Sequence, residues 1–357
     1  MLKIKDGLWY MPGLVDLHVH FREPGQTHKE DLASGAAAAV RGGFTTVCAM
    51  PNTLPPVDSV DWVKFTLENS AKIGLAEILP IAAITEGMKG LILTDLEGMA
   101  AAGAVGFSED GLSVRNAALK LEAMRLAAAL ELPIFSHCED MDLPGIHPAS
   151  EEVLVARDII LAEHSGARLH ICHISTALSV QLVREAKARG VRVTAEVSPH
   201  HFTLCADDIP NHDPNFKMNP PLRTKADIAA IKAGLADGTI DAIATDHAPH
   251  HADEKAKGFA DAPFGIIGLE TALSLAFELV DEGVLTPQQL VEKMSLNPKR
   301  ILGITRNEDF TIFDPNAEWV VNSTEFASKA QNTPFEGRKM RGRVVRTIIG
   351  GRIVYDN

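Results

Sequence analysis

The apolar stretch of residues 14–20 contains two histidines with one residue between them, and an arginine follows two residues later. Side chains two positions apart on a strand point to the same face, so His18 and His20 converge at the end of this stretch. Two neutral imidazoles held in this way can bind a divalent metal ion, and the adjacent Arg22 can pair with an anion. A strand with two hydrogen-bonded core histidines is the alternative interpretation.

Four further candidate ligands lie at the ends of later apolar runs. They are Asp110, His137, His173 and Asp246. We expect His173 rather than His170 to be the ligand, because it lies nearer the end of its run. Imidazole and carboxylate groups that converge on one axis suit Zn2+ or another divalent ion that tolerates imidazole. Taken singly, the aspartate after the fourth run could be a turn residue, and each histidine could belong to the core.

The segment of residues 244–251 holds one carboxylate and three histidines. Asp246 is the candidate general base, because it lies at the end of an apolar run and can accept a proton from water beside the metal ions. His250 lies farther along the loop, where it could meet a substrate. We expect His247 and His251 to lie behind the site or at the surface.

Short apolar runs alternate with longer amphipathic segments between about residues 14 and 285. The expected strands are residues 14–20, 45–50, 77–84, 104–108, 133–138, 168–174, 192–197 and 242–247. The expected helices include residues 28–40, 116–130, 148–164, 177–188, 225–235, 270–285 and 287–302. This alternation predicts an α/β fold, a (β/α)8 TIM-type barrel over residues 12–302, in which the active site lies at the carboxyl ends of the strands.

Beyond residue 302 the pattern becomes strand-like, at residues 310–314, 318–322, 344–349 and 352–355. Gly350 and Gly351 separate the last two runs, as the residues of a hairpin turn do. We therefore expect a small, reduced β appendage made of residues 303–357 together with residues 1–11.

Composition narrows the class of protein further. Hydrophobic residues make up 46% of the 357 residues, and no apolar run is long enough to span a bilayer. The formal net charge of −13 disfavours nucleic acid and anionic membranes as partners, so an anionic substrate needs local positive charge. The 4 cysteines are far apart and form no CxxC pair, which is typical of reduced thiols in a cytoplasmic enzyme.

The chain resembles the class I dihydroorotases, a branch of the amidohydrolase superfamily. The resemblance runs in order through residues 12–25, 42–47, 50–53, 107–111, 136–140, 172–176, 217–223, 244–250 and 262–265. It implies the reversible cyclisation of N-carbamoyl-L-aspartate to L-dihydroorotate, a step of pyrimidine biosynthesis. It also implies two Zn2+ ions on the six candidate ligands, bridged by Asp110 and by a hydroxide that attacks the ring amide. Asp246 would then be the general acid and base.

The resemblance further implies a set of substrate contacts. The residues that match contacts to the substrate carboxylate are Arg22, Asn52 and His250. The residues that match contacts to the pyrimidine ring are Asn219, Phe264 and Gly265, the last two through their backbone. Without the resemblance, the last two would be interpreted as an ordinary turn.

Two alternatives to this interpretation stand beside it. Hydantoinases, allantoinases and dihydropyrimidinases are similar enzymes, but they bridge their metals with a carboxylated lysine after the fourth strand. The sequence has no lysine between Lys89 and Lys120, so Asp110 must take that role, with no dependence on bicarbonate. The second alternative is a non-catalytic scaffold for aspartate transcarbamoylase, although none of the six ligands is missing.

The chain departs from the family pattern in two places. Family members usually carry more β-strands before residue 12, and residues 141–147 replace a longer insertion. A reduced β appendage would leave apolar barrel surface exposed, and large exposed patches usually mark partner contacts. We therefore expect a homo-oligomer, a dimer, with aspartate transcarbamoylase as a candidate further partner.

Overall fold

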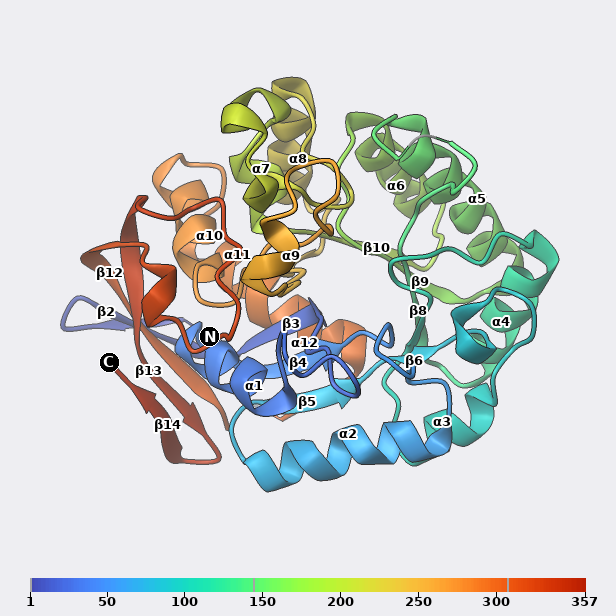
Figure 1. Ribbon diagram of the computed structural model, residues 1–357, viewed down its shortest axis with the longest axis horizontal. Helices are drawn as coiled ribbons and strands as arrows, with labels where there is room; N and C mark the ends of the chain where they lie inside the picture. The colour runs from blue at the N-terminus through green and yellow to red at the C-terminus, as the bar shows by residue number, and fades with distance from the viewer. Residues whose placement is uncertain (1, 144, 307) are drawn as a thin grey trace.

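The computed structural model describes residues 2–143, 145–306 and 308–357, and its centre is a ring of parallel strands surrounded by helices (Figure 1). The strands of the ring are β3 (Leu14–Val19), β4 (Phe44–Ala49), β5 (Glu77–Pro80), β6 (Ala82–Ala83), β7 (Phe107–Ser108), β8 (Pro133–Ser136), β9 (Arg168–Ile171), β10 (Val193–Val197) and β11 (Ala242–Ile243). They pair in two sheets, one in the order β3-β4-β5 and one in the order β11-β10-β9-β8-β7-β6.

Backbone contacts continue the ring where the two sheets meet. At one edge, Val19 and His247 form a parallel bridge, which joins the first strand to the segment after β11. At the other edge, the N–H of Val105 donates to the carbonyl of Pro80 at 3.0 Å. β5 and β6 are separated by one residue, so together they occupy a single strand position of the ring. The predicted TIM-type α/β barrel is confirmed.

Helices surround the ring of strands, and several of them begin at residues that cap a helix. The helices are α1 (Leu32–Arg41), α2 (Val60–Ile73), α3 (Leu96–Ala102), α4 (Ala117–Ala129), α5 (Ala149–Ser165), α6 (Ala177–Ala188), α7 (Pro199–Thr203), α8 (Lys225–Asp237), α9 (Ala252–Lys255), α10 (Ala272–Asp281), α11 (Pro287–Val291) and α12 (Asn297–Leu302). Asp31, Thr224 and Thr286 each form a capping box at the start of α1, α8 and α11. A π-helical segment, Glu292–Leu296, interrupts the single helix expected over residues 287–302.

A five-stranded antiparallel sheet lies beside the barrel (Figure 1). Its strands are, in spatial order, β1 (Lys3–Lys5), β2 (Leu8–Pro12), β12 (Phe310–Val320), β13 (Lys339–Ile349) and β14 (Arg352–Asp356). The two separate strands expected at residues 310–314 and 318–322 are wrong, because β12 runs through both and absorbs the intervening residues as a bulge between Asp314 and Glu318. The division of the chain into a barrel domain and an appendage stays a prediction.

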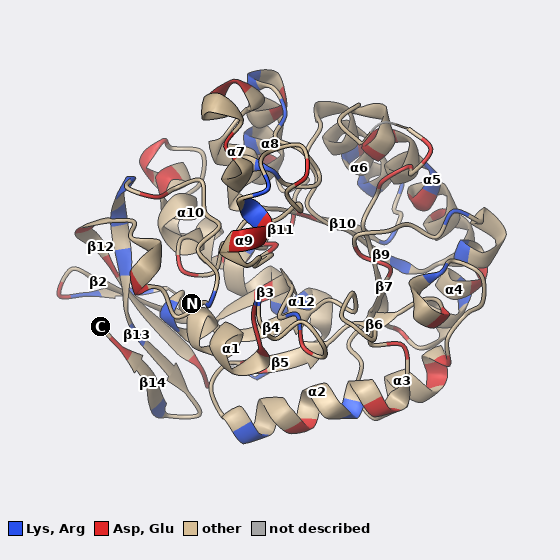
Figure 2. Ribbon diagram, in the orientation of Figure 1, with Lys and Arg blue, Asp and Glu red and all other residues tan. Residues whose placement is uncertain are grey.

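Charge is spread over the outer surface rather than concentrated on one element. Figure 2 shows basic and acidic residues alternating along α2 and scattered over the other outer helices. A net charge of −13 on such a surface gives a small anionic substrate no general attraction, so binding depends on local cations. Among the described residues, no helix is both long enough and apolar enough to cross a membrane.

Candidate metal centre and substrate pocket

The six predicted ligands meet at the carboxyl ends of the barrel strands. His18 is the penultimate residue of β3, and the others lie on the segments that follow β3, β7, β8, β9 and β11. All six are buried, and they are His18, His20, Asp110, His137, His173 and Asp246. Parallel strands bring their carboxyl ends to one face of a barrel, which explains how residues so far apart in the sequence share one site.

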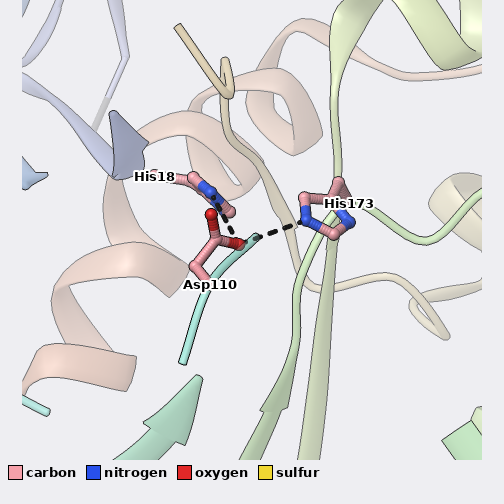
Figure 3. A group of neighbouring side chains, drawn as sticks. All are labelled: His18, Asp110 and His173. Atoms are coloured by element: carbon pink, nitrogen blue, oxygen red, sulfur yellow. Dashed lines mark ion pairs between the residues drawn. The ribbon is translucent and has the colours of Figure 1, made fainter. Parts of the chain in front are cut away.

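Asp110 lies at the middle of this cluster. One of its carboxylate oxygens, Oδ1, lies 3.3 Å from His18 Nε2 and 3.5 Å from His173 Nε2 (Figure 3). The same oxygen lies 3.6 Å from His137 Nδ1. The other, Oδ2, lies 3.4 Å from His20 Nε2. A carboxylate that faces histidines with both oxygens can be shared between two neighbouring ions.

Asp246, which follows β11, faces the two histidines at the end of β3. Its Oδ1 lies 3.1 Å from His20 Nε2 and 3.5 Å from His18 Nε2. Two groups of potential ligands result, with all ligand atoms of each group within 4.8 Å of one another. One is His18, His20 and Asp246, and the other is His18, Asp110 and His173.

The donor set fits a divalent cation. His18 Nε2, Asp110 Oδ1 and His173 Nδ1 are buried without a hydrogen-bond partner, which costs free energy unless another group compensates them. The Nδ1–H of His18 donates to Glu196 at 2.9 Å, so in the neutral ring the lone pair of Nε2 faces two carboxylates. A cation between these groups would relieve that repulsion, and imidazole with carboxylate is a donor set for zinc-like ions.

Acidic and basic groups in the cluster shift one another's protonation. Burial opposes charge on His18, but the carboxylates of Asp110 and Asp246 outweigh it and raise the pKa of His18 well above its usual value. Burial likewise opposes ionisation of the two aspartates, but His18 and its neighbours hold the pKa of Asp110 and of Asp246 well below the usual range. Both carboxylates are therefore ionised at neutral pH.

The backbone is bent at three of the site residues. Arg22, His173 and Asp246 have φ angles of 59°, 33° and 49°, which lie in the left-handed region that non-glycine residues rarely adopt. Each follows a barrel strand within a few residues. Such backbone strain persists where surrounding structure enforces it, and it is concentrated at functional sites.

Glu196 is a functional residue that the sequence did not single out. Its two carboxylate oxygens accept hydrogen bonds from His18 Nδ1 at 2.9 Å and from His170 Nε2 at 3.0 Å. Burial opposes its ionisation, but these histidines lower the pKa of Glu196 to about 2. The sequence signal that could have identified Glu196 is a carboxylate inside a mostly apolar strand, β10. His170 thus lies behind the ligands, as expected.

Two further polar residues orient His20 and His137. Asn52 Oδ1 accepts from His20 Nδ1 at 2.8 Å, and its amide nitrogen faces Asp110 at 3.5 Å. Glu139 accepts from His137 Nε2 at 2.9 Å and from the amide of Asn219 at 2.8 Å. These bonds turn one nitrogen of each ring toward the centre, as partners of metal-binding histidines usually do.

Cys172, the residue before His173, also lies close to the centre. Its sulfur forms a third group of potential ligand atoms with His18 and Glu196, all within 4.8 Å of one another. Burial raises the pKa of Cys172 to about 12, so the thiol is neutral. His247 is buried, with Nε2 3.4 Å from a carboxylate oxygen of Glu30, and His251 is exposed at the start of α9. Of the three histidines in this segment, His250 is the one that contacts Arg22.

Arg22 and His250 form the basic side of the candidate substrate pocket. Arg22 Nη2 lies 3.2 Å from His250 Nε2, and Arg22 Nε donates to the carbonyl of Pro249 at 3.2 Å. Burial lowers the pKa of Arg22 to about 10, so it stays charged at neutral pH. Burial and the charge of Arg22 lower the pKa of His250 to about 3, so that imidazole is neutral. Arg22 is therefore the cation available to an anionic group here.

A cavity of about 710 Å³ opens next to the cluster. Glu139, Lys217, Asn219 and Phe264 are among the residues that line it. The predicted ring contacts Asn219 and Phe264 thus share one cavity. The N–H of Gly265 instead donates to the carbonyl of Lys217 at 2.9 Å, so a backbone contact to a ring from this segment falls to Phe264.

Lys255 ties together the loops that form this cavity. Its buried ammonium donates to the carbonyls of Pro214 at 2.9 Å, Lys217 at 3.4 Å and Pro263 at 2.9 Å. Burial, reinforced by the charge of Lys217, lowers the pKa of Lys255 to about 7. No residue pattern indicates this contact, because Pro214 and Lys217 lie far from α9 along the chain and Pro263 lies in the irregular segment that follows it.

Comparisons with known proteins agree with this geometry. The family model described as "Dihydro-orotase-like" matches residues 7–179. A dihydroorotase from Pelotomaculum thermopropionicum is 50% identical over 98% of this chain and 87% of that protein, and one from Pelobacter propionicus is 46% identical over 98% and 88%. The solved structure of L-hydantoinase (dihydropyrimidinase) from Arthrobacter aurescens has a TM-score of 0.86 at 26% identity, over 97% of this chain and 85% of that one.

An α/β barrel whose strand ends gather four histidines and two aspartates defines the amidohydrolase class of enzymes. Within that class, the identity to curated relatives over nearly the whole chain is much higher than the identity to the hydantoinase structure. The chain belongs to the dihydroorotase family.

Proposed function

We propose that this protein interconverts N-carbamoyl-L-aspartate and L-dihydroorotate, with two zinc ions held by the six clustered ligands. The observation that carries the proposal is the position of Asp110, which faces the histidines of both halves of the cluster with its two carboxylate oxygens. A pair of divalent ions there would need a shared anion, and the sequence has no lysine between Lys89 and Lys120 that could be carboxylated.

Bound divalent ions would polarise the amide carbonyl and promote ionisation of a water molecule at neutral pH. Asp246 is ionised and buried next to His20, so it can accept a proton from the attacking water and return it to the departing ring nitrogen. The reverse sequence closes the ring. Asp246 is the residue of the cluster that can both face an ion and exchange a proton.

The chain's own residues would hold and orient the substrate. Arg22 supplies a buried positive charge for the substrate carboxylate, and His250 adds a neutral hydrogen-bonding group beside it. Asn219 and Phe264 line the adjoining cavity, where the ring would lie. Asn52 is already bonded to His20 and has a second N–H that could reach the carboxylate.

A metal-removal experiment tests the proposal. The enzyme is treated with dipicolinate, and hydrolysis of dihydroorotate is measured before and after zinc is restored, beside hydantoin, allantoin and dihydrouracil. We expect activity on dihydroorotate alone, lost with the metal and recovered at about two zinc ions per chain, the number suited to a shared carboxylate. Zinc binding with turnover of hydantoin instead would move the assignment to the hydantoinase branch. Zinc binding without any turnover would favour a scaffold or a required partner.

The oligomeric state and the cellular location of the protein stay predictions. We propose a homo-oligomer, because exposed apolar side chains such as Leu91 and Ile92 remain on the barrel surface, at 74% and 60% exposure. Light scattering over a range of concentrations would test it, and a strictly monomeric species would contradict it.

A further inference from the structure

The segment that connects β12 to β13 returns to the barrel instead of staying with the β sheet. Residues 327–333 of this segment, which we call the tail segment, lie beside the start of α1 (Figure 1). The N–H groups of Ala327 and Ser328 donate to Glu270 at 2.9 and 3.3 Å. The hydroxyl of Ser328 donates to the buried carboxylate of Glu30. The tail segment is therefore fixed to the barrel by several buried polar contacts.

Asn332 is the residue of the tail segment that reaches the substrate pocket. Its side chain is buried, and its Oδ1 accepts from the backbone N–H of His250 at 3.0 Å. Its amide nitrogen donates to the carbonyl of Ala248 at 3.0 Å and to the carbonyl of Gly265 at 2.9 Å. Both amide hydrogens and one lone-pair direction are thus used, and all three partners are backbone groups of the two loops beside Arg22.

The two loops held by Asn332 approach each other closely. A Cβ atom built on Gly265 would lie 2.5 Å from the carbonyl oxygen of Ala248 and 2.6 Å from Cδ2 of the His250 ring. The backbone of Gly265 therefore packs directly against the imidazole. The carbonyl of Asn332 also accepts from the N–H of Ile267 at 3.0 Å, which fixes the second loop at another point.

We propose that Asn332 is a positioning residue of the substrate pocket, which holds His250 beside Arg22 and holds the loop of Phe264 and Gly265 against it. The tail segment then supports two loops of the active site from behind. The inference rests on the proposed function, because it assigns His250 and Phe264 to substrate binding. Asn332 touches none of the six metal ligands, so its contribution is separable from metal binding.

Two variants of Asn332 test this role by different chemistry. Asn332→Ala removes all three hydrogen bonds. Asn332→Asp keeps the size and the acceptor for His250, but it turns a carboxylate oxygen toward the carbonyls of Ala248 and Gly265. We expect either variant to raise KM for dihydroorotate about tenfold and to change kcat less than about threefold. This pattern results when an interaction made equally in the ground state and the transition state is lost. Asn316→Ala, on the exposed bulge of β12, is the matched control and should match the native enzyme.

Two readouts separate positioning from a general loss of structure. Hydrogen exchange should become faster at the amide of His250 in Asn332→Ala, with metal content equal to that of the native protein. In a double-mutant cycle with His250→Ala, the effects on KM should be less than additive, because Asn332 acts through His250. If Asn332→Ala does not fold, Asn332→Asp carries the test.

The outcomes distinguish this inference from the proposed function. An unchanged KM in both variants of an active enzyme would overturn the role of Asn332, and so would a loss of activity that follows loss of metal. A native protein that holds zinc but neither binds nor turns over dihydroorotate would overturn the proposed function. In that case the exchange of the His250 amide still reports whether Asn332 positions the loop.

Discussion

Nδ1 of His18 lies 2.9 Å from a carboxylate oxygen of Glu196, while Nε2 of the same ring faces the carboxylates of the metal centre. Because a carboxylate can only accept, the neutral ring of His18 keeps its proton on Nδ1 and directs the lone pair of Nε2 to the centre. Glu196 thus selects the tautomer that can bind a metal ion.

Replacing Glu196 by Gln should weaken metal binding without removing a ligand. Partners of metal-binding histidines typically contribute 10- to 100-fold in affinity, so we expect an increase of about that size in the dissociation constant for zinc. Competition with a chromogenic chelator measures it. Glu122→Gln, on the exposed face of α4, is the control. Equal zinc affinity in the two variants would show that Glu196 serves only the core.

Replacing Asp246 by Asn should prevent proton transfer and leave the fold intact. The amide keeps the shape of the side chain but cannot accept the proton of the attacking water. We expect kcat for dihydroorotate hydrolysis to fall about 100- to 10,000-fold, the range for loss of a general acid or base. Asp253→Asn, at a side chain that is 92% exposed, is the control. A fall explained wholly by loss of metal would instead assign Asp246 a ligand role alone.

Metal loading of the apoenzyme should not depend on bicarbonate. Asp110 presents a permanent carboxylate to His18 and His173. Burial opposes its ionisation, but the histidines around it hold the pKa of Asp110 well below the usual range, so no carbon dioxide adduct is needed. Zinc reconstitution followed by activity should proceed equally in degassed buffer and in buffer with added bicarbonate. Faster or greater recovery with bicarbonate would point to a carboxylated lysine elsewhere.

Residues that end a strand could be assigned from the sequence, and residues that act through loops could not. His18, His137 and Asp246 follow apolar runs, and parallel strands necessarily bring such positions to one face of a barrel. Asn332 and Lys255 offered no comparable pattern. Their partners are backbone carbonyls and N–H groups of distant loops, and the path of a loop depends on tertiary packing rather than on local periodicity.

The same distinction applies to the predicted substrate contacts, which stay predictions. Arg22 and His250 were grouped by the resemblance to the dihydroorotases, and the structure brings them to 3.2 Å of one another. The backbone of Gly265 was expected to face the ring, but its N–H is taken by the carbonyl of Lys217. A backbone hydrogen bond between two irregular segments has no signature in residue types.

Replacing Gly265 by Ala should widen the pocket at the cost of stability. The new methyl group would overlap the carbonyl oxygen of Ala248 and the ring of His250, so the loop must move away. Overpacking of this kind costs about 1–3 kcal/mol, and we expect a loss of that size in the free energy of unfolding together with a higher KM. Gly258→Ala has a left-handed φ of +84° but open space around it, so it should affect stability alone.

Replacing Lys255 by Met should remove a pH-dependent part of the stability. The pKa of Lys255 is lowered by burial to about 7 in the folded protein, against 10.5 when exposed. Lys217 and Arg22 lower it as well, while Asp213 and Glu254 oppose the shift. Between pH 7 and about 10 the unfolded chain thus binds a proton that the folded chain has released, so the free energy of unfolding rises with pH over this window.

Met at position 255 has no proton to release, so the difference in stability between native protein and Lys255→Met should grow in favour of the native protein from pH 7 to pH 9. The slope is at most about 1.4 kcal/mol per pH unit for one titrating group. Urea unfolding at pH 7, 8 and 9 measures it, with Lys257→Met, at an exposed neighbour, as the control. Parallel pH profiles for native protein and Lys255→Met would mean that the carbonyls of Pro214, Lys217 and Pro263 keep Lys255 charged throughout. In that case the ammonium holds the pocket loops together at every pH at which the enzyme is folded.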